Sequence, residues 1–377
     1  MADKRLKQRG TKNGMKVWTA RLPHPRGPDG ERRQRRFTFI GNKKDAEKAL
    51  VAELAAMGNG TYVEADRTTF GQYVNDFVAS KKSTYAHTSW ARFESLARIN
   101  IIPKLGDIPL QKLSTMQLNK AYAAWHEGGL SGQTVQHHHR FIHRVLEEAL
   151  REGRVRQNVA ATATKPRVPK REMRSLSTEE VGRLIATAFG TAFAPLVTVA
   201  VACGARRGEL LGAKFDDVDF ARGTLSIRRS LEQTKAGIAE KSPKSGKSRV
   251  IQLPEIALEA LRRHQVSRGR IGPGYIFPGD DPAKPWTPQK VSDGFRALAK
   301  RAKISGASFH SLRHTCASLL LAQGTHPKIV QEMLGHSTIA ITMDLYSHAT
   351  PSLQAEAATK LDAALQSALA GASAVIA

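Results

Sequence analysis

The stretch CGARRGELLGAKFDDVDF, residues 203–220, sets two adjacent arginines and a glutamate among apolar residues. Arg206 and Glu209 are three positions apart and would share one face of a helix, with Leu210 and Leu211 beside them. An arginine placed early on a helix among apolar neighbours needs an anionic partner. That partner is either Glu209, in a salt bridge within the helix, or an anion that the protein binds.

A group of lysines follows in KSPKSGKSRVIQLP, residues 241–254. Lys241, Lys244 and Lys247 occupy a turn rich in Ser, Gly and Pro that precedes a predicted strand. A lysine at the tip of a hairpin is flexible and can reach a bound phosphodiester. For at least two of the three lysines, a solvated turn is the better interpretation.

Histidines and a further arginine come together in FHSLRHTCASLLLAQG, residues 309–324. His310 and Arg313 share one face of the predicted helix, and His314 lies four residues after His310. Paired histidines at this spacing occur in zinc metalloproteases, but here the residues between them include a cation and no glutamate. We therefore expect no metal site on this helix.

The stretch LGHSTIAITMDLYSH, residues 334–348, contains a single tyrosine. The pattern predicts a helix that ends at Gly335, His336 just beyond it, and a short helix that ends at Tyr346. Taken alone, Tyr346 is better explained as a packing residue. The three other stretches favour a nucleophilic hydroxyl.

This set of side chains fits attack on a phosphodiester without a metal. Arginine offers the non-bridging oxygens a bidentate and permanently charged partner. Histidine can orient the phosphate or take the proton of the nucleophile, and lysine can protonate the departing 5′ oxygen. A tyrosine can then form a covalent link to the phosphate, which stores the bond energy for religation without ATP.

The four stretches, in this order, resemble those of the tyrosine recombinases, and most closely the integrases of phages and transposons. The match covers residues 175–350 and includes the nine residues between His336 and Tyr346. It implies that Tyr346 is the nucleophile, which forms an O-(3′-phospho-DNA)-tyrosine intermediate, and that Glu209 supports the site. The catalytic residues that it implies are Arg206, Lys244, His310, Arg313, His336 and Tyr346.

One assignment within this set has alternatives. Lys247 or Lys241 replaces Lys244 if the lysine turn aligns differently. Arg207 has no role in the implied set, and we expect it to be solvated or to face DNA. The resemblance implies no cofactor and no metal.

Charge supports a nucleic-acid partner. The 377 residues include 58 Lys and Arg against 33 Asp and Glu, a net charge of +25, and a chain this basic usually binds a polyanion. We find no basic amphipathic membrane anchor, spanning segment or signal peptide. Cys203 and Cys316 form no disulfide framework, so we expect a reducing cytoplasm, in association with a bacterial nucleoid.

Two smaller domains are predicted before the catalytic one. Residues 1–11 are expected to form a disordered basic tail. Residues 12–62 predict a strand, a turn, a second strand and a helix capped by Asn42, with a basic face suited to the DNA major groove. In the resemblance this unit corresponds to an arm-binding domain.

Helices alone are predicted for residues 67–155, which correspond to a core-binding domain. One of these helices begins with a capping box of Ser114 and Gln117, and another is expected to be stopped by Pro103 and Gly106. Residues 156–174 are basic and aperiodic, and they predict a linker.

The predicted fold class is mainly α with small β elements, an α+β protein. The mixed α/β catalytic domain, residues 175–350, opens with a capping box of Ser177 and Glu180. A tail helix is expected within residues 351–377. It would pack on its own chain or on a neighbouring protomer.

The family implies a site-specific recombinase that acts on double-stranded DNA attachment sites as a homotetramer, through a Holliday junction, and integrates or excises a mobile element. An accessory DNA-bending or directionality factor is a further possible partner, and no membrane is involved. Two alternatives remain open. One is activity like that of a type IB topoisomerase, and the other is a DNA-binding regulator on the same scaffold.

Overall fold

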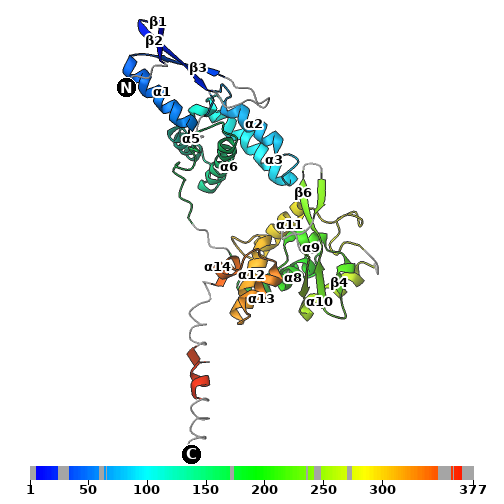
Figure 1. The fold of residues 1–377 in the computed structure, drawn as a ribbon. Helices are drawn as coiled ribbons and strands as arrows, with labels where there is room; N and C mark the ends of the chain where they lie inside the picture. Colours follow the sequence, from blue (N-terminus) through cyan, green and yellow to red (C-terminus); the bar gives the residue numbers. More distant parts are fainter. Residues whose placement is uncertain are drawn as a thin grey trace, which may run out of the picture. The chain divides into compact units, whose positions relative to one another are not determined.

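The computed structural model describes residues 6–23, 34–58, 63–64, 66–169, 174–234, 237–241, 248–269, 274–346, 358–359 and 361–366. The chain divides into two compact units, Met1–Pro169 and Lys170–Ala377, drawn in Figure 1. The predicted α+β class is confirmed, because helices dominate both units and the strands form small antiparallel sheets. No helix in the described ranges is long and apolar enough to cross a membrane.

A three-stranded antiparallel sheet and one helix open the first unit (Figure 1). Leu22 and Phe37 of the sheet and Leu50 of the helix are buried together in a small core. The helix is capped by Asn42, whose Oδ1 accepts the backbone N–H of Asp45 at 2.8 Å. The elements are β1 Lys7–Lys12, β2 Met15–Pro23, β3 Gln34–Ile40 and α1 Lys43–Gly58.

The predicted tail at residues 1–11 is wrong in its last part, because residues 7–12 form β1. This strand pairs with β2 as far as Lys12 opposite Met15. The turn between the two strands is Asn13-Gly14, with φ of 51° and 76°. Positive φ at both positions is what a type I′ hairpin requires, and Asn-Gly is its favoured pair.

The rest of the first unit is helical, and the capping box of Ser114 and Gln117 is present. Of the two residues predicted to stop the second helical stretch, Gly106 is confirmed as its C-cap, whereas Pro103 does not end it. The chain widens into a π-helical turn in which the N–H of Ile102 donates to the carbonyl of Ala97, and a helix continues past the proline. Such a turn accommodates the missing N–H and the bulk of the ring. The elements are α2 Phe70–Ser80, α3 His87–Leu96, the π-helix Ala97–Ile101, α4 Ile102–Leu105, the 3₁₀ turn Leu110–Lys112, α5 Thr115–Glu127 and α6 Gly132–Arg151.

The first part of the predicted linker belongs to this helical core. Ala160 and Ala163 are buried in it. Asn158 Nδ2 donates to the carbonyl of His143 and to a Glu147 carboxylate oxygen, both at 3.0 Å. Small apolar residues in successive turns have no helical period, which is why the pattern assigned residues 156–163 to a linker.

The second unit surrounds the buried helix α8 (Figure 1). Its first helix begins with the expected capping box of Ser177 and Glu180. Between the two predicted strands lies an unpredicted hairpin, β6–β7, where the sequence indicated only a polar turn. The helices are α7 Thr178–Ala188, α8 Phe193–Cys203, α9 Arg207–Gly212, the 3₁₀ turn Phe215–Asp217, α10 Glu255–Ser267, α11 Pro288–Arg301, α12 Phe309–Ala322, α13 Pro327–Leu334 and α14 Ile339–Tyr346. The strands are β4 Val218–Asp219, β5 Thr224–Ile227, β6 Ser230–Thr234, β7 Gly237–Lys241 and β8 Arg249–Gln252.

Packing brings the sequence stretches of interest together. Helix α12 contacts α8, α13 and α14, while β8 of the β4-β5-β8 sheet contacts α13. The segment that joins α8 to α9 lies close to Arg313, in the first half of α12, and to the carboxyl end of α13. Residues 358–359 and 361–366 are helical, and the rest of 351–377 lies outside the described residues, so the packing of the tail stays a prediction.

Candidate active site

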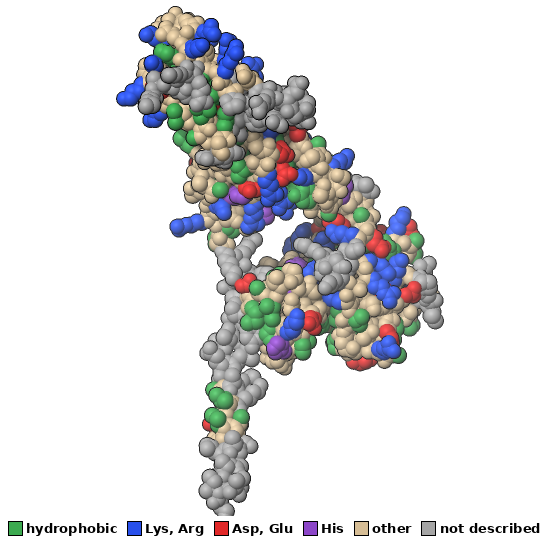
Figure 2. Space-filling view, viewed as in Figure 1, with side chains coloured by type: hydrophobic (Ala, Val, Ile, Leu, Met, Phe, Trp, Pro, Cys, Tyr) green, Lys and Arg blue, Asp and Glu red, His purple; other side chains and the backbone are tan. Residues whose placement is uncertain are grey.

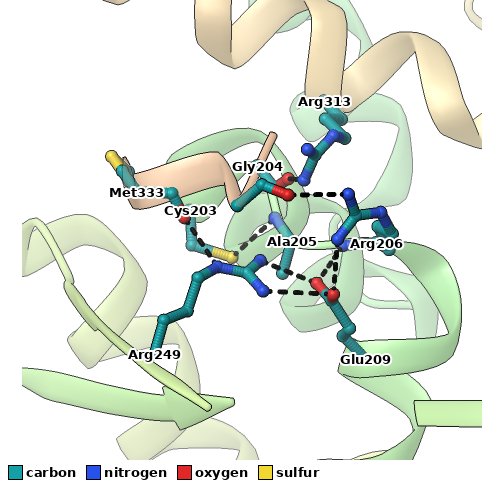
Figure 3. A network of polar contacts seen from close by, with 9 residues as sticks. Cys203, Gly204, Ala205, Arg206, Glu209, Arg249, Arg313 and Met333 are labelled. Atoms are coloured by element: carbon teal, nitrogen blue, oxygen red, sulfur yellow. Dashed lines mark hydrogen bonds and ion pairs between the residues drawn. The ribbon is translucent and has the colours of Figure 1, made fainter. Parts of the chain in front are cut away.

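Arg206 stands at the entrance to α9 as its N-cap, with an extended backbone at φ −68° and ψ 149°. Its Nη1 donates to Glu209 Oε1 at 2.9 Å, and its backbone N–H donates to Glu209 Oε2 at 2.8 Å. Its Nη2 reaches the carbonyl of Gly335 at 2.9 Å, at the end of α13. The salt bridge expected from the three-residue spacing is thus present. Arg206 also ties two distant stretches together (Figure 3).

Glu209 is only 1% exposed and has a second arginine partner, Arg249, the first residue of β8. Arg249 Nη1 and Nη2 donate to the two carboxylate oxygens at 3.1 and 2.7 Å, and Nε donates to the carbonyl of Met333 at 2.9 Å (Figure 3). Burial by itself raises the pKa of Glu209, but the hydrogen bonds and charge of Arg249, together with the hydrogen bonds from Arg206, outweigh it and hold the pKa below its usual range. The carboxylate is therefore ionised at neutral pH.

Sequence reasoning missed Arg249. The available signal was Glu209 itself, since a carboxylate followed by two leucines on a buried helix needs more charge than one partly exposed arginine provides. Nothing local to SRVIQLP marks this arginine, because its partners lie 40 and 84 residues away in the chain.

Arg313 of α12 is the most deeply buried arginine of the site, at 3% exposure. Its Nη1 donates to the carbonyl of Gly204 at 2.8 Å. Its Nη2 is buried without a hydrogen-bond partner among the described residues. Desolvation, and then repulsion from Arg206, lower the pKa of Arg313 to about 10, so it remains a cation at neutral pH. A buried guanidinium with free donor capacity is suited to an anion from outside the chain.

Two histidines adjoin these arginines. His310 and His314 meet edge to face, with ring centroids 4.7 Å apart. Desolvation by the neighbouring side chains, followed by the charges of His314 and Arg313, lowers the pKa of His310 to about 4, although the residue as a whole is exposed. His310 is therefore neutral at physiological pH and can accept a proton.

His336 follows α13 and is half-buried. Its Nδ1 lies 2.9 Å from the hydroxyl of Thr342, a fully buried residue of α14. Desolvation and the charges of Arg313 and Arg206 lower its pKa to about 4. The contact joins the imidazole to the helix that ends at Tyr346.

Two glycines shape the corner around these groups. Gly204 ends α8 in the left-handed region, with φ 59°, and a Cβ added there would overlap Leu334 and lie 3.1 Å from Cys316 Sγ. Gly335 ends α13 with φ 68°, where any other residue is strained. Helix α13 thus rests directly on the end of α8, which brings its carbonyl end to the arginines.

The expectation that Arg207 is solvated is wrong, and the alternative, that it faces DNA, stays a prediction. Arg207 is half-buried, and its Nη1 donates to the hydroxyl of Ser292 on α11. Desolvation lowers its pKa. The expectation failed because α11 packs against α9, a contact between segments about 80 residues apart that no local pattern shows.

The structure thus brings Arg206, Glu209, His310, Arg313 and His336 together. Of the lysines, Lys241 ends β7 and forms an ion pair with Glu232 at 2.7 Å. Lys244 and Lys247 lie outside the described residues. Tyr346 is the last residue of α14, and its side chain likewise lies outside them.

Comparison with known proteins gives two family matches. Residues 174–352 match the phage integrase family, and residues 69–126 match the N-terminal SAM-like domain of phage integrases. A tyrosine recombinase XerC-like protein of Caldanaerobacter subterraneus subsp. tengcongensis is 24% identical over 383 residues, which cover 93% of this chain and 97% of that protein. An integrase of Saccharopolyspora erythraea is 22% identical over 410 residues, covering 92% and 93%.

Solved structures with the same fold include a Tn1549 transposon integrase in complex with a circular intermediate DNA. It has a TM-score of 0.70 and 21% identity, over 78% of this chain and 99% of that one. A lambda integrase tetramer bound to a Holliday junction has a TM-score of 0.61 and 19% identity, over 91% and 95%. At these identities the likeness establishes the fold.

Proposed function

Because the chain belongs to the phage integrase family of tyrosine recombinases, we propose that it cuts and rejoins specific DNA sites through a phosphotyrosyl link at Tyr346, and so integrates or excises a mobile element. The observation that carries this proposal is the cationic floor of the site. There, Arg206 and Arg249 are bonded to the Glu209 carboxylate, while the buried Arg313 interacts with it only at longer range and keeps a donor without a partner among the described residues. A phosphodiester supplies the anion that this arrangement lacks.

In the proposed reaction the Tyr346 hydroxyl attacks the phosphorus, forming a phosphorus–oxygen bond to the 3′-phosphate while the bond to the 5′ oxygen breaks. Arg206 and Arg313 donate to the non-bridging oxygens, where negative charge gathers in the transition state. The tyrosine proton passes to a base, and Lys244 donates a proton to the departing 5′ oxygen. Religation is the same sequence in reverse, with the 5′ hydroxyl of the partner strand as nucleophile.

His310 is the proposed base. Its lowered pKa, about 4, leaves an imidazole nitrogen free to take a proton at neutral pH. His336, whose Nδ1 already contacts Thr342, has Nε2 left to contact a phosphate oxygen. In this assignment, Glu209 takes no part in the chemistry and holds Arg206.

The decisive experiment is Tyr346→Phe on a suicide DNA substrate whose 5′ product strand diffuses away after cleavage. The wild-type protein should accumulate a covalent protein–DNA adduct visible on a denaturing gel, and the variant should form none while binding DNA as before. An adduct that persists in the variant would remove Tyr346 from the mechanism. No adduct with wild-type protein would instead favour a regulator on a recombinase scaffold.

The lysine assignment has its own test, a substrate with sulfur in place of the scissile 5′ oxygen. A thiolate leaves without protonation, so this substrate should restore cleavage to a variant that lacks the general acid. We expect Lys244→Ala to be rescued in this way. Lys241→Ala is the matched control and should cleave the normal substrate well, because Lys241 is already paired with Glu232. If the sulfur-substituted substrate rescued Lys247→Ala and not Lys244→Ala, the general acid would be Lys247.

Surface charge supports DNA as the partner of the first unit. The β1–β3 sheet has a hollow lined by Lys7, Arg9, Arg21 and Arg36, and Figure 2 shows Lys and Arg side chains gathered over this part of the molecule. A second hollow, on the helical domain, is lined by Arg140, His143, Arg144, Arg151 and Lys165, with Glu147 and Glu148. In this proposal residues 12–62 bind arm sites and residues 67–155 bind core sites, with steep salt dependence.

The assembly proposed is a tetramer on two DNA sites, as in the lambda integrase complex with a Holliday junction. It would act in the cytoplasm at the nucleoid, with or without an accessory DNA-bending or directionality factor. Footprinting of the full chain tests this, since separate arm-type and core-type protected regions are expected. Protection of core-type sites alone would remove the arm-binding role of the β1–β3 sheet.

A further inference from the structure

Arg249 makes more connections in the site than its place in the chain suggests. It is 11% exposed, and its three guanidinium nitrogens are all bonded, two to Glu209 and one to the carbonyl of Met333 (Figure 3). Within the described residues the two oxygens of Glu209 accept four hydrogen bonds, two from Arg206 and two from Arg249. Glu209 therefore lies between the two arginines and is shared by them.

Resting on the proposed function, we propose that Arg249 is a positioning residue for DNA cleavage. It would hold Glu209 and the carboxyl end of α13 in one arrangement, so that Arg206 and His336 meet the phosphate together. Arg249 does not itself need to touch DNA, because all of its nitrogens are already bonded. Its effect would pass through the residues that it holds.

The first part of this effect concerns Arg206. With Arg249 present, each oxygen of Glu209 accepts one bond from each arginine, and Arg206 needs only Nη1 and its backbone N–H for the carboxylate. Without Arg249, the buried carboxylate of Glu209 would lose two charged donors. It would then either form further hydrogen bonds with Arg206 or take up a proton. Either change moves a phosphate ligand away from its place.

The second part concerns the end of α13. The last carbonyls of a helix lack partners within it and interact favourably with cations. Arg249 binds the carbonyl of Met333, and Arg206 binds that of Gly335, immediately before His336. Arg206 and Arg249, both bonded to Glu209, thus hold the carboxyl end of α13, which is followed in the chain by His336 and α14.

Arg249→Gln tests the proposal, in the full chain on the suicide substrate under single-turnover conditions. We expect unchanged DNA affinity and a cleavage rate about 100-fold lower, as for other small misplacements of reacting groups. Arg249→Lys keeps the charge but not the bidentate contact, and should recover part of the rate. A cleavage rate equal to wild type in Arg249→Gln would overturn the proposal.

The matched control is Arg229→Gln. Arg229 is also a mostly buried arginine of the second unit, bonded to a buried carboxylate, Asp217 at 2.6 Å, and to the carbonyl of Gly212 at the end of α9. It should lower thermal stability as Arg249→Gln does and leave the cleavage rate of the folded protein unchanged. Equal loss of rate in both variants would mean that Arg249 serves stability alone.

Two further measurements cover a variant that folds poorly and separate positioning from acid catalysis. Glu209→Gln and the double variant Glu209→Gln/Arg249→Gln should slow cleavage by similar factors, because residues that act as one unit are not additive. The sulfur-substituted substrate should not rescue Arg249→Gln. A shared positioning role would be contradicted if the rate loss of the double variant equalled the product of the two single losses. It would also be contradicted if the sulfur-substituted substrate restored cleavage to Arg249→Gln. If the wild-type protein forms no adduct, the proposed function itself is wrong. This outcome is distinguishable from a failure of the Arg249 proposal, because it is observed with the wild-type protein before any variant is made.

Discussion

The second unit contains two clusters of arginines around a buried carboxylate, and they differ in charge balance. In the cluster around Glu209, Arg206 and Arg249 are bonded to the carboxylate, and Arg313 interacts with it at longer range. Three arginines thus share one carboxylate. Arg313 also keeps a buried Nη2 without a partner among the described residues.

The cluster around Asp217 is balanced. Arg229 is bonded to Asp217 at 2.6 Å and pairs with Glu240 at 3.5 Å, while the exposed Arg228 lies 3.6 Å from Asp217. Both clusters bury a carboxylate, and both anchor the end of a helix. What separates them is the excess of positive charge in the first, so charge balance marks a candidate site better than the presence of a buried ion pair.

The largest effect is expected from removing the unbalanced charge. Arg313→Ala should lower the single-turnover cleavage rate about 1000-fold, because a preorganised donor to the transition state is lost. Arg228→Ala, its counterpart in the Asp217 cluster, should cleave like wild type. Equal rates in Arg313→Ala and wild type would abolish the functional distinction between the clusters.

The balanced cluster should matter for stability. Arg229→Gln leaves Asp217 buried without its main partner and should lower the free energy of unfolding by about 3 kcal/mol. Arg228→Gln should cost less than about 1 kcal/mol, because its side chain is 58% exposed. Chemical denaturation of both variants measures the difference. A loss of cleavage in folded Arg229→Gln would contradict the division of roles between the two clusters.

An anion should stabilise the unbalanced cluster only. Sulfate or phosphate at about ten times its dissociation constant should raise the free energy of unfolding by roughly 1.4 kcal/mol through linkage. Arg229→Gln should retain this gain, and Arg313→Ala should lose most of it. Equal stabilisation of Arg313→Ala by sulfate would place the bound anion elsewhere.

The smallest effect concerns pH. His310 and His336 have a pKa of about 4 in the folded chain, against about 6.5 when unfolded, so the unfolded state binds more protons between these values. Their contribution to stability is complete above about pH 6.5 and is lost as pH falls toward 4. Sulfate should weaken this dependence by neutralising the arginines. Thermal denaturation from neutral to acidic pH, with and without sulfate, measures this pH dependence of stability. If sulfate left the slope of stability against pH unchanged, the prediction would be contradicted.

Local signals predicted much of this fold. The capping boxes of Ser114 and Ser177 depend on residues three positions apart, and both are present. Asn13-Gly14 is an equally local signal for a hairpin turn. Sequence reasoning overlooked it, and strand β1 was therefore not predicted. For the candidate site, spacing and family resemblance identified the residues that the structure brings together at Glu209.

The rest depended on contacts between distant parts of the chain. The partners of Arg249 lie on other elements, and the packing of Arg207 against Ser292 depends on α11. The histidine triplet of α6 shows the same limit. Sequence reasoning treated it as a biased run, but His138 is fully buried against Trp125, with ring centroids 4.7 Å apart. A residue's neighbours across the fold decided its role in each of these cases.

Gly204 imposes a steric requirement on a site whose other groups act through charge. There is no space for a methyl group between the end of α8 and Leu334 of α13. Alanine at this position would be strained at φ 59° and would have to displace Leu334 Cδ2 at the end of α13, next to the carbonyls of Met333 and Gly335 that the arginines bind, with every charged group still present. In a mutational library selected for recombination, position 204 should therefore tolerate as little as the nucleophile does, although glycine contributes no side chain to the chemistry.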